Sequence, residues 1–144
     1  MIDRILKLFQ SPDEESGQVD PTLAAAALMF EVVWADHDVG EDEIQTMSAQ
    51  LMDLFDLDAT RIGELIEQTK TNHDTSVGVY SFTRIINEQL SQEEKFEILC
   101  AMWRIALADE QIDAFEEHTI RRIADLLYVP HARFIEAKLV AKNP

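Results

Sequence analysis

Residues 35–43 read ADHDVGEDE, and residues 108–116 repeat the pattern as ADEQIDAFE. In both stretches Ala-Asp is followed, after two residues, by an aliphatic side chain and, after three more, by Glu. Apolar residues spaced three and four apart flank both stretches, so each stretch ends one amphipathic helix and begins another. The chain is therefore predicted to contain two related units, each made of a helix, an acidic turn and a helix.

The similarity between the two units extends beyond the turns. Asp109 lies 73 residues after Asp36, and past the turn the offset becomes 72, which aligns Leu51 with Ile123. Three helices of each unit align in this way, and a helix over about residues 75–90 joins the two halves. Because an open solenoid needs three or more repeats, two units favour pseudo-two-fold packing.

Signals for helix ends place about seven core helices along the chain. Pro21 after Asp20 begins the first, and Ser91 and Asp113 each open a capping box with the Glu three residues later. With no alternating strand pattern and only four glycines, the fold class is all-α, a compact single-domain bundle of about seven core helices. In the first half the expected helices run from residue 21 to the first acidic turn, from 40 or 41 to about 55, and from 59 to about 70, followed by a turn at 71–74. A fourth helix runs from a cap at 74 or 75 to residue 90. In the second half the expected helices run from 91 to the second acidic turn, from 113 to 127, and from 130 onward.

The N-terminal segment differs from the rest of the chain. Its apolar residues have helical spacing and predict a short N-terminal helix: Ile2, Ile5, Leu6 and Phe9. Residues 11–18 are acidic and rich in helix breakers, so we divide the chain into residues 1–19, a helix with an acidic linker, and residues 20–144, the helical domain. A helix this short is not stable alone in water, so residues 1–9 dock on the domain, fray, or contact a partner helix or the periphery of a membrane.

The 144 residues suffice for one domain and carry a formal net charge of −16. This charge excludes nucleic acids as partners, because phosphate binding needs clustered Lys and Arg, and it disfavours adsorption to anionic lipid. Residues 8–60 contain thirteen Asp and Glu but no Lys or Arg. Such a surface suits a cation or a basic partner, or it only keeps the protein soluble. The two last helices hold the basic residues Arg121, Arg122, Arg133, Lys138 and Lys142.

The only cysteine, Cys100, lies in the apolar run ILCAMW at residues 98–103 and is predicted to be a buried thiol. One cysteine allows no disulfide within the chain, which fits a reducing compartment. The sequence contains neither a signal-peptide pattern nor an apolar stretch of the roughly eighteen residues that a transmembrane helix needs. These features predict a cytoplasmic protein with no transmembrane segment.

Helix capping is the first explanation of the acidic turns. Glu116 would occupy the third position of a helix capped by Asp113, and Glu43 the same position after Gly40. A carboxylate there favours the helix dipole by about 0.3–1 kcal/mol. Capping therefore accounts for the second half of each turn without any ligand.

A cation site is the second explanation. Asp36 and Asp109 lie at the C-terminal end of a helix, where negative charge is unfavourable unless amide donors, a basic partner or a cation compensates. Carboxylate oxygens suit hard cations, so Ca²⁺ or Mg²⁺ is the expected ion. An EF-hand does not fit, because a loop that starts at Asp36 would place Met47 at position twelve, where the motif requires Glu. The candidate metal ligands are Asp36, Asp38, Glu43, Asp109, Asp113 and Glu116.

The sequence contains no catalytic constellation. Its four histidines are scattered, and it has no Ser/His/Asp or Cys/His grouping, no glycine-rich phosphate loop and no nucleophile elbow. A zinc site would need two or more His or Cys at close spacing. We therefore predict no catalytic residue and no cofactor beyond a divalent cation.

The repeated Ala-Asp-x-x-[Val/Ile]-x-x-x-Glu turns, together with RRIADLL at residues 121–127, resemble the TerB-like (tellurite-resistance protein B) domain family. The resemblance covers about residues 21–142. It implies a compact all-helical fold, a link to tellurite and chemical-stress resistance, and acidic surface residues that have been proposed to bind divalent metal. The motif carries over Asp36, Glu43, Asp109 and Glu116, and no catalytic residue.

We therefore expect a non-catalytic binding or interaction module of a stress-response system. Its expected partner is a protein, and a response to divalent cations is a separate hypothesis to be tested. Two alternatives stay open. The first is a metal-dependent enzyme that holds its metal in the acidic turns, which would need a concave pocket joining them. The second is a structural assembly protein, whose acidic N-terminal and more basic C-terminal surfaces would associate.

Overall fold

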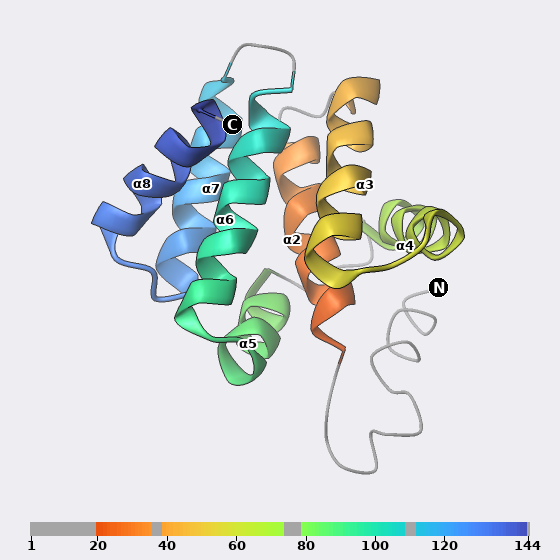
Figure 1. Cartoon of the computed structure of the whole chain (residues 1–144), viewed down its shortest axis with the longest axis horizontal. Coiled ribbons are helices and arrows are strands. Elements are labelled where there is room, and N and C mark those ends of the chain that lie inside the picture. Colours follow the sequence, from red (N-terminus) through yellow and green to blue (C-terminus); the bar gives the residue numbers. More distant parts are fainter. Residues whose placement is uncertain (1–19, 36–38, 74–78, 109–111, 144) are drawn as a thin grey trace.

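The computed structural model describes residues 20–35, 39–73, 79–108 and 112–143. Within these ranges the chain forms seven α-helices and no strand, which confirms the predicted all-α class. In chain order they are α2 (Pro21–Trp34), α3 (Glu41–Phe55), α4 (Ala59–Asn72), α5 (Val79–Gln89), α6 (Gln92–Ala106), α7 (Ala114–Leu126) and α8 (His131–Lys142) (Figure 1). The expected helix over residues 1–9 and the expected cap at 74 or 75 lie outside the described residues. No helix in the described ranges is long and apolar enough to cross a membrane.

The helix starts agree with the sequence signals, because a cap acts over only two or three residues. The Asp58 carboxylate accepts a hydrogen bond from the backbone N–H of Arg61 at 2.8 Å, and Asp20 caps α2 in a similar way. At the start of α6 the Ser91 hydroxyl accepts from the N–H of Glu94 at 3.1 Å. The Glu94 carboxylate in turn accepts from the N–H of Ser91 at 2.8 Å, so the predicted capping box is complete.

The end of α4 differs from the prediction. The prediction of a turn at residues 71–74 is wrong for residues 71 and 72, because α4 continues to Asn72. His73 follows, and its ring lies edge-on against Phe30 and Trp34 of α2, with centroid distances of 5.1 and 5.4 Å. These contacts hold the end of α4 against α2, so tertiary packing extends the helix beyond its local signals.

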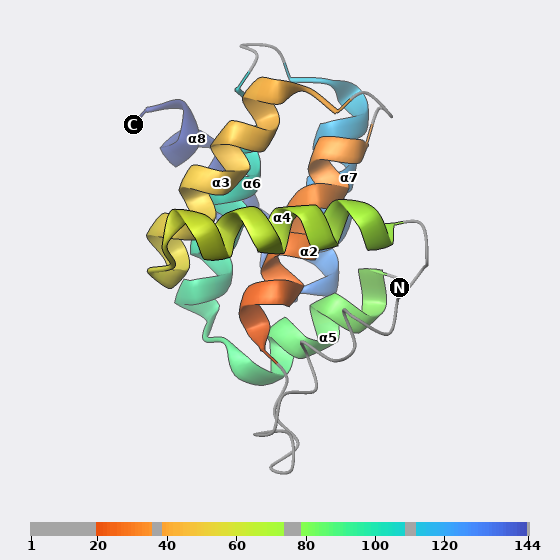
Figure 2. The ribbon, with the colours of Figure 1, turned by 90° about the vertical axis from the view of Figure 1, so that its right-hand side faces the viewer.

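The centre of the bundle is formed by α2 and α6. Residues 23–30 of α2 and residues 98–103 of α6 are all buried, and Trp103 is fully enclosed, as its apolar surroundings predicted. α2 contacts five helices, α3 to α7, and α6 contacts α2, α3, α7 and α8 (Figure 2). The alanine run of α2 lets neighbouring helix axes approach closely, which allows one helix to be covered on all sides.

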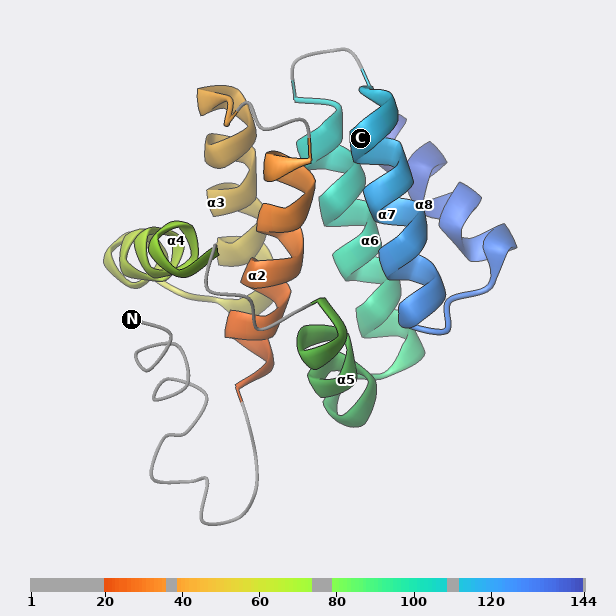
Figure 3. The same ribbon diagram turned by 180° about the vertical axis from the view of Figure 1, so that it is seen from behind.

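The helix contacts follow the same pattern in the two halves. α2, α3 and α4 contact one another, and so do α6, α7 and α8. Between the halves α2 packs on α6, α3 on α6 and α2 on α7, while α5 bridges α2 and α7 (Figure 3). Pseudo-two-fold packing of two three-helix units requires such a pattern. The sequence repeat stays a prediction, and this pattern of contacts supports it.

Candidate functional site

The two acidic turns belong to one end of the bundle. α2 and α6 run in the same direction and end there, and α3 and α7 begin there (Figures 1 and 3). Three of the predicted metal ligands lie outside the described residues: Asp36, Asp38 and Asp109. The other three are described: Glu43, Asp113 and Glu116.

Glu43 and Glu116 occupy matching buried positions at the starts of α3 and α7. Their exposed fractions are only 5 % and 1 %. The backbone N–H of Gly40 donates to the Glu43 carboxylate at 3.3 Å, and that of Asp113 donates to the Glu116 carboxylate at 3.3 Å. A Cβ atom at Gly40 would lie 2.8 Å from Glu43 Oε1, so the cap of α3 leaves little room for a side chain there. Both glutamates therefore act as N3 residues of a cap, as predicted.

Asp113 completes the cap of α7. Its carboxylate accepts a hydrogen bond from the N–H of Phe115 at 2.7 Å. Among the described residues no three His, Cys, Asp or Glu side chains lie close enough together to hold a metal ion. Glu43, Asp113 and Glu116 each take part in a helix cap, and the six-residue cation site stays a prediction, because half of its ligands fall outside the described ranges.

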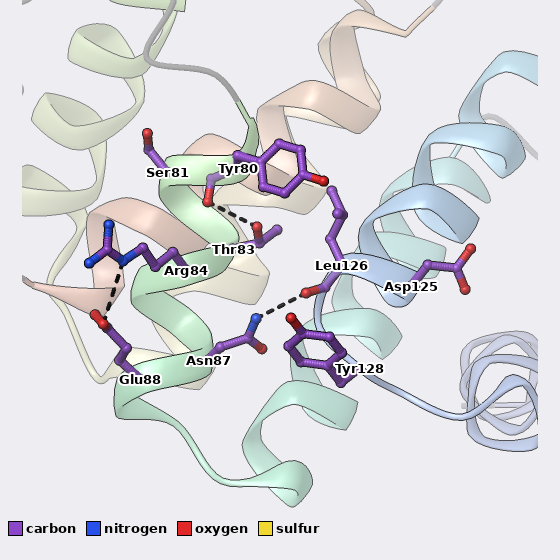
Figure 4. Close-up of a pocket in the computed structure, with 9 residues that line it drawn as sticks. All are labelled: Tyr80, Ser81, Thr83, Arg84, Asn87, Glu88, Asp125, Leu126 and Tyr128. Carbon is purple, nitrogen blue, oxygen red and sulfur yellow. Dashed lines mark hydrogen bonds and ion pairs between the residues drawn. The ribbon is translucent and has the colours of Figure 1, made fainter.

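A groove of about 600 Å³ lies elsewhere, between α5 and the C-terminal end of α7; we call it the α5–α7 groove. Figure 4 shows its side chains, which come from α5 and from the end of α7; the residues on the two sides are more than thirty positions apart in the chain. It is lined by Tyr80, Ser81, Thr83, Arg84, Asn87, Glu88, Asp125, Leu126 and Tyr128. None of these residues belongs to the acidic turns, so the sequence motifs did not predict this surface.

The α7 side of the groove is built by an unusual helix end. Tyr128 has a positive φ of 58°, in the left-handed region. Its N–H donates to the carbonyl of Asp125 at 3.1 Å, and the N–H of Val129 donates to the carbonyl of Ala124 at 3.0 Å. These two bonds define a Schellman motif, in which the left-handed residue is usually glycine. A tyrosine there carries a backbone cost of about 1–2 kcal/mol.

Two tyrosines define the exposed face of the groove. Tyr80 on α5 is 71 % exposed, and Tyr128 is 74 % exposed. Between them Asn87 donates from Nδ2 to the carbonyl of Leu126 at 2.9 Å, which ties α5 to the end of α7 (Figure 4). A hydrogen bond across the groove therefore joins the two elements that carry the tyrosines.

Most of the other side chains of the groove are polar; Arg84 and Glu88 are exposed, whereas Thr83 is buried. Arg84 and Glu88 form an ion pair at 3.6 Å on the outer face of α5. The Thr83 hydroxyl donates to the carbonyl of Tyr80 at 3.1 Å, and Asp125 points away from the two tyrosines (Figure 4). The groove thus offers aromatic faces, phenol and serine hydroxyls and an amide, which suits recognition by stacking and hydrogen bonding.

One sequence signal could have pointed to this surface. Tyr128 is followed by Val129 and Pro130, and a helix that stops before proline commonly ends in a glycine at that place. A large aromatic residue where glycine is expected indicates a constraint other than stability. Tyr80 carries no comparable local signal, because only the packing of α5 on α7 brings it to the groove.

Cys100 is placed as the sequence predicts. It lies on α6 with its side chain buried in the core, and burial raises the pKa of its thiol from 9.0 to about 11. A thiol is a nucleophile only as the thiolate, so Cys100 is chemically inert near neutral pH.

Comparison with known proteins identifies the family. No curated protein and no solved structure matches the chain significantly. The family model described as "Tellurite resistance protein TerB" matches residues 22–139, which is nearly the whole helical domain. The match agrees with the resemblance of the acidic turns and with the all-helical fold. The chain therefore belongs to the TerB family of tellurite resistance proteins.

Proposed function

We propose that this TerB-family chain is a non-catalytic binding module of the cytoplasm, which recognises a partner protein through the α5–α7 groove. One observation carries the proposal: Tyr128 is 74 % exposed at a backbone position that disfavours bulky side chains. Strain of this kind persists when the residue is needed for another reason. An exposed tyrosine has no packing role that would explain it.

The chemistry of the groove supports a protein partner. Tyrosine is enriched where proteins bind one another, because its ring supplies contact area at low entropy cost and its hydroxyl forms hydrogen bonds. Tyr80 and Tyr128 offer two such rings, and the hydrogen bond from Asn87 to Leu126 holds the surfaces that carry them.

Binding rather than catalysis is supported by the state of the reactive groups. The Cys100 thiol is buried and protonated at neutral pH. In the groove Arg84 is paired with Glu88 on the outer face of α5, where both side chains face bulk water. A general acid or base would instead lie in a pocket within hydrogen-bond reach of a reacting group.

Selection of peptides from a random phage-displayed library on the full chain tests the proposal. Selected peptides are titrated by calorimetry, and we expect Tyr128→Gly and Tyr80→Ala to weaken binding by about tenfold or more, a hot-spot loss. Asp56→Gly is the matched control, because Asp56 is the other described residue with positive φ and lies outside the groove. If the selected peptides bind Tyr128→Gly and the unchanged chain with equal affinity, the proposal is wrong.

A response to divalent cations is the second candidate function. It is favoured by the two buried carboxylates, Glu43 and Glu116, which occupy matching positions in the first turns of α3 and α7. Chelator-treated protein is titrated with Ca²⁺ and Mg²⁺, and we expect binding heat and a rise in Tm. The double variant Asp36→Asn with Asp109→Asn should abolish both effects. No heat at millimolar ion rejects this candidate. Metal-dependent turnover would instead favour an enzyme, and salt-dependent oligomers an assembly protein.

A further inference from the structure

A second hollow lies on another face of the bundle, between the last turn of α3 and the first half of α6. It has a volume of about 270 Å³, and we call it the α3–α6 groove. Leu54, Phe55, Leu90 and Ile98 supply its apolar lining. Asp53, Glu94 and Glu97 supply its polar lining, and no basic residue lines it. The groove therefore combines an apolar floor with charge of one sign.

Helix ends add to the negative potential at this groove. The C-terminus of a helix carries a partial negative charge, which a basic residue in the last turn usually offsets. α4, α6 and α8 have such residues, whereas α2, α3, α5 and α7 have none. Asp53 lies in the last turn of α3, and Leu90 directly follows α5, so two of these uncompensated ends border the groove.

The carboxylates of the groove are not neutralised by the rest of the described chain. Asp53 and Glu97 are exposed and form no ion pair with any described residue. Glu94 is engaged only as the cap of α6, where its carboxylate accepts from the N–H of Ser91 at 2.8 Å. Residues 8–60 contain no Lys or Arg at all, so α3 has no basic residue of its own.

We propose that the α3–α6 groove docks a basic amphipathic segment of a partner protein. One or two apolar side chains of the segment enter between Leu54, Leu90 and Ile98, and Lys or Arg side chains on either side face Asp53 and Glu97. Charge complementarity decides the occupant, because an acidic or neutral segment would leave the carboxylates and the two helix ends uncompensated. The volume falls below the range typical of cofactor sites, which fits an anchoring side chain rather than a cofactor. This surface is separate from the α5–α7 groove and does not depend on the function proposed there.

Two synthetic peptides probe the groove directly. The first is an amphipathic peptide of about fourteen residues made of Leu and Lys, and the second has the same Lys residues with Ala in place of Leu. Fluorescence anisotropy measures both against the full chain at about 0.15 M salt, where charges further apart than about 8 Å are screened. We expect the Leu peptide to bind at least about tenfold more tightly, because only it fills the apolar floor. Equal affinities would overturn the proposal, since they would show attraction by net charge alone.

Two charge variants with the same net charge separate the groove from the rest of the surface. We expect the double variant Asp53→Asn with Glu97→Gln to weaken binding of the Leu peptide about tenfold, which lies within the range for two exposed ion pairs. The control, Glu41→Gln with Glu64→Gln, removes two exposed charges outside the groove and should change affinity by less than about twofold. In NMR spectra of the unchanged chain the largest peptide-induced shifts should lie at Leu54, Leu90 and Ile98. An equal loss in both variants, or shifts elsewhere, would refute the assignment.

Discussion

Asp56 and Tyr128 adopt the same left-handed backbone conformation, with φ values of 52° and 58°, at sites 72 residues apart. They are the only non-glycine residues with positive φ in the described part of the chain. The offset is the one that relates the two units beyond their acidic turns, and each residue follows the second helix of its unit. Aspartate tolerates this conformation, because its short polar side chain can bond locally, whereas tyrosine does not.

This difference predicts that Tyr128→Gly stabilises the protein. Glycine relieves the strained backbone but is more flexible in the unfolded chain, so we expect a net gain of about 0.5–1 kcal/mol. For a domain of this size the gain corresponds to a rise of roughly 2–3 °C in Tm. Asp56→Gly should gain less. Urea unfolding measures both, and a destabilised Tyr128→Gly would show that the ring is needed for packing.

Asn87 is predicted to stabilise the end of α7. The carbonyl of Leu126 is one of the last four of its helix, which have no partner within the helix, and Asn87 donates to it at 2.9 Å. Asn87→Ala should cost about 1 kcal/mol in the free energy of unfolding. Hydrogen exchange should speed up at Tyr128 and Val129 more than in α2. Unchanged exchange there would mean that the Schellman bonds alone hold this end.

Glu116 is predicted to act through its hydrogen bond rather than its charge. Glutamine keeps an acceptor for the N–H of Asp113, so Glu116→Gln should cost less than about 1 kcal/mol. Glu116→Ala removes the acceptor and leaves space at a buried position, which should cost about 2 kcal/mol. Glu64→Ala, on the exposed face of α4, serves as the control. Thermal unfolding in chelator-treated buffer measures all three; similar large losses for Gln and Ala would point to the charge.

Cys100 is predicted to make stability depend on alkaline pH. Its pKa is raised from 9.0 to about 11 in the folded state, so the unfolded chain loses the thiol proton first as the pH rises. Its contribution is fully present below pH 9 and is lost progressively as the pH approaches 11. The difference in urea midpoint between the unchanged chain and Cys100→Ala should therefore shrink over this range. A constant difference would contradict the pKa. Thiol reagents should label Cys100 only after unfolding.

Local sequence was sufficient for most helix starts. Asp20, Asp58 and Ser91 cap helices as predicted, because the hydrogen bonds of a cap join residues two or three apart. The end of α4 was misplaced for the opposite reason. His73 is held by Phe30 and Trp34, about forty residues earlier in the chain, and such contacts leave no local signal.

The candidate sites divide in the same way. The buried positions of Glu43 and Glu116 were predictable as the third residues of capped helices. The α5–α7 groove was not, because Tyr80 lies in α5 and Tyr128 follows α7, and the two line one groove only when α5 packs against α7. Only the Tyr-Val-Pro end of α7 carried a local signal, through a tyrosine where glycine would be usual.

By itself the sequence determined the all-α class, the order and most starts of the helices, and the family, since these depend on apolar periodicity and on caps that act within one helical turn. The tertiary structure alone decided which side chains share a surface. The α5–α7 groove joins residues of two helices, and the α3–α6 groove joins the ends of α3 and α5 to α6. The physical reason is that packing of the buried faces sets the relative positions of helices, whereas the exposed residues that form a site contribute little to that packing.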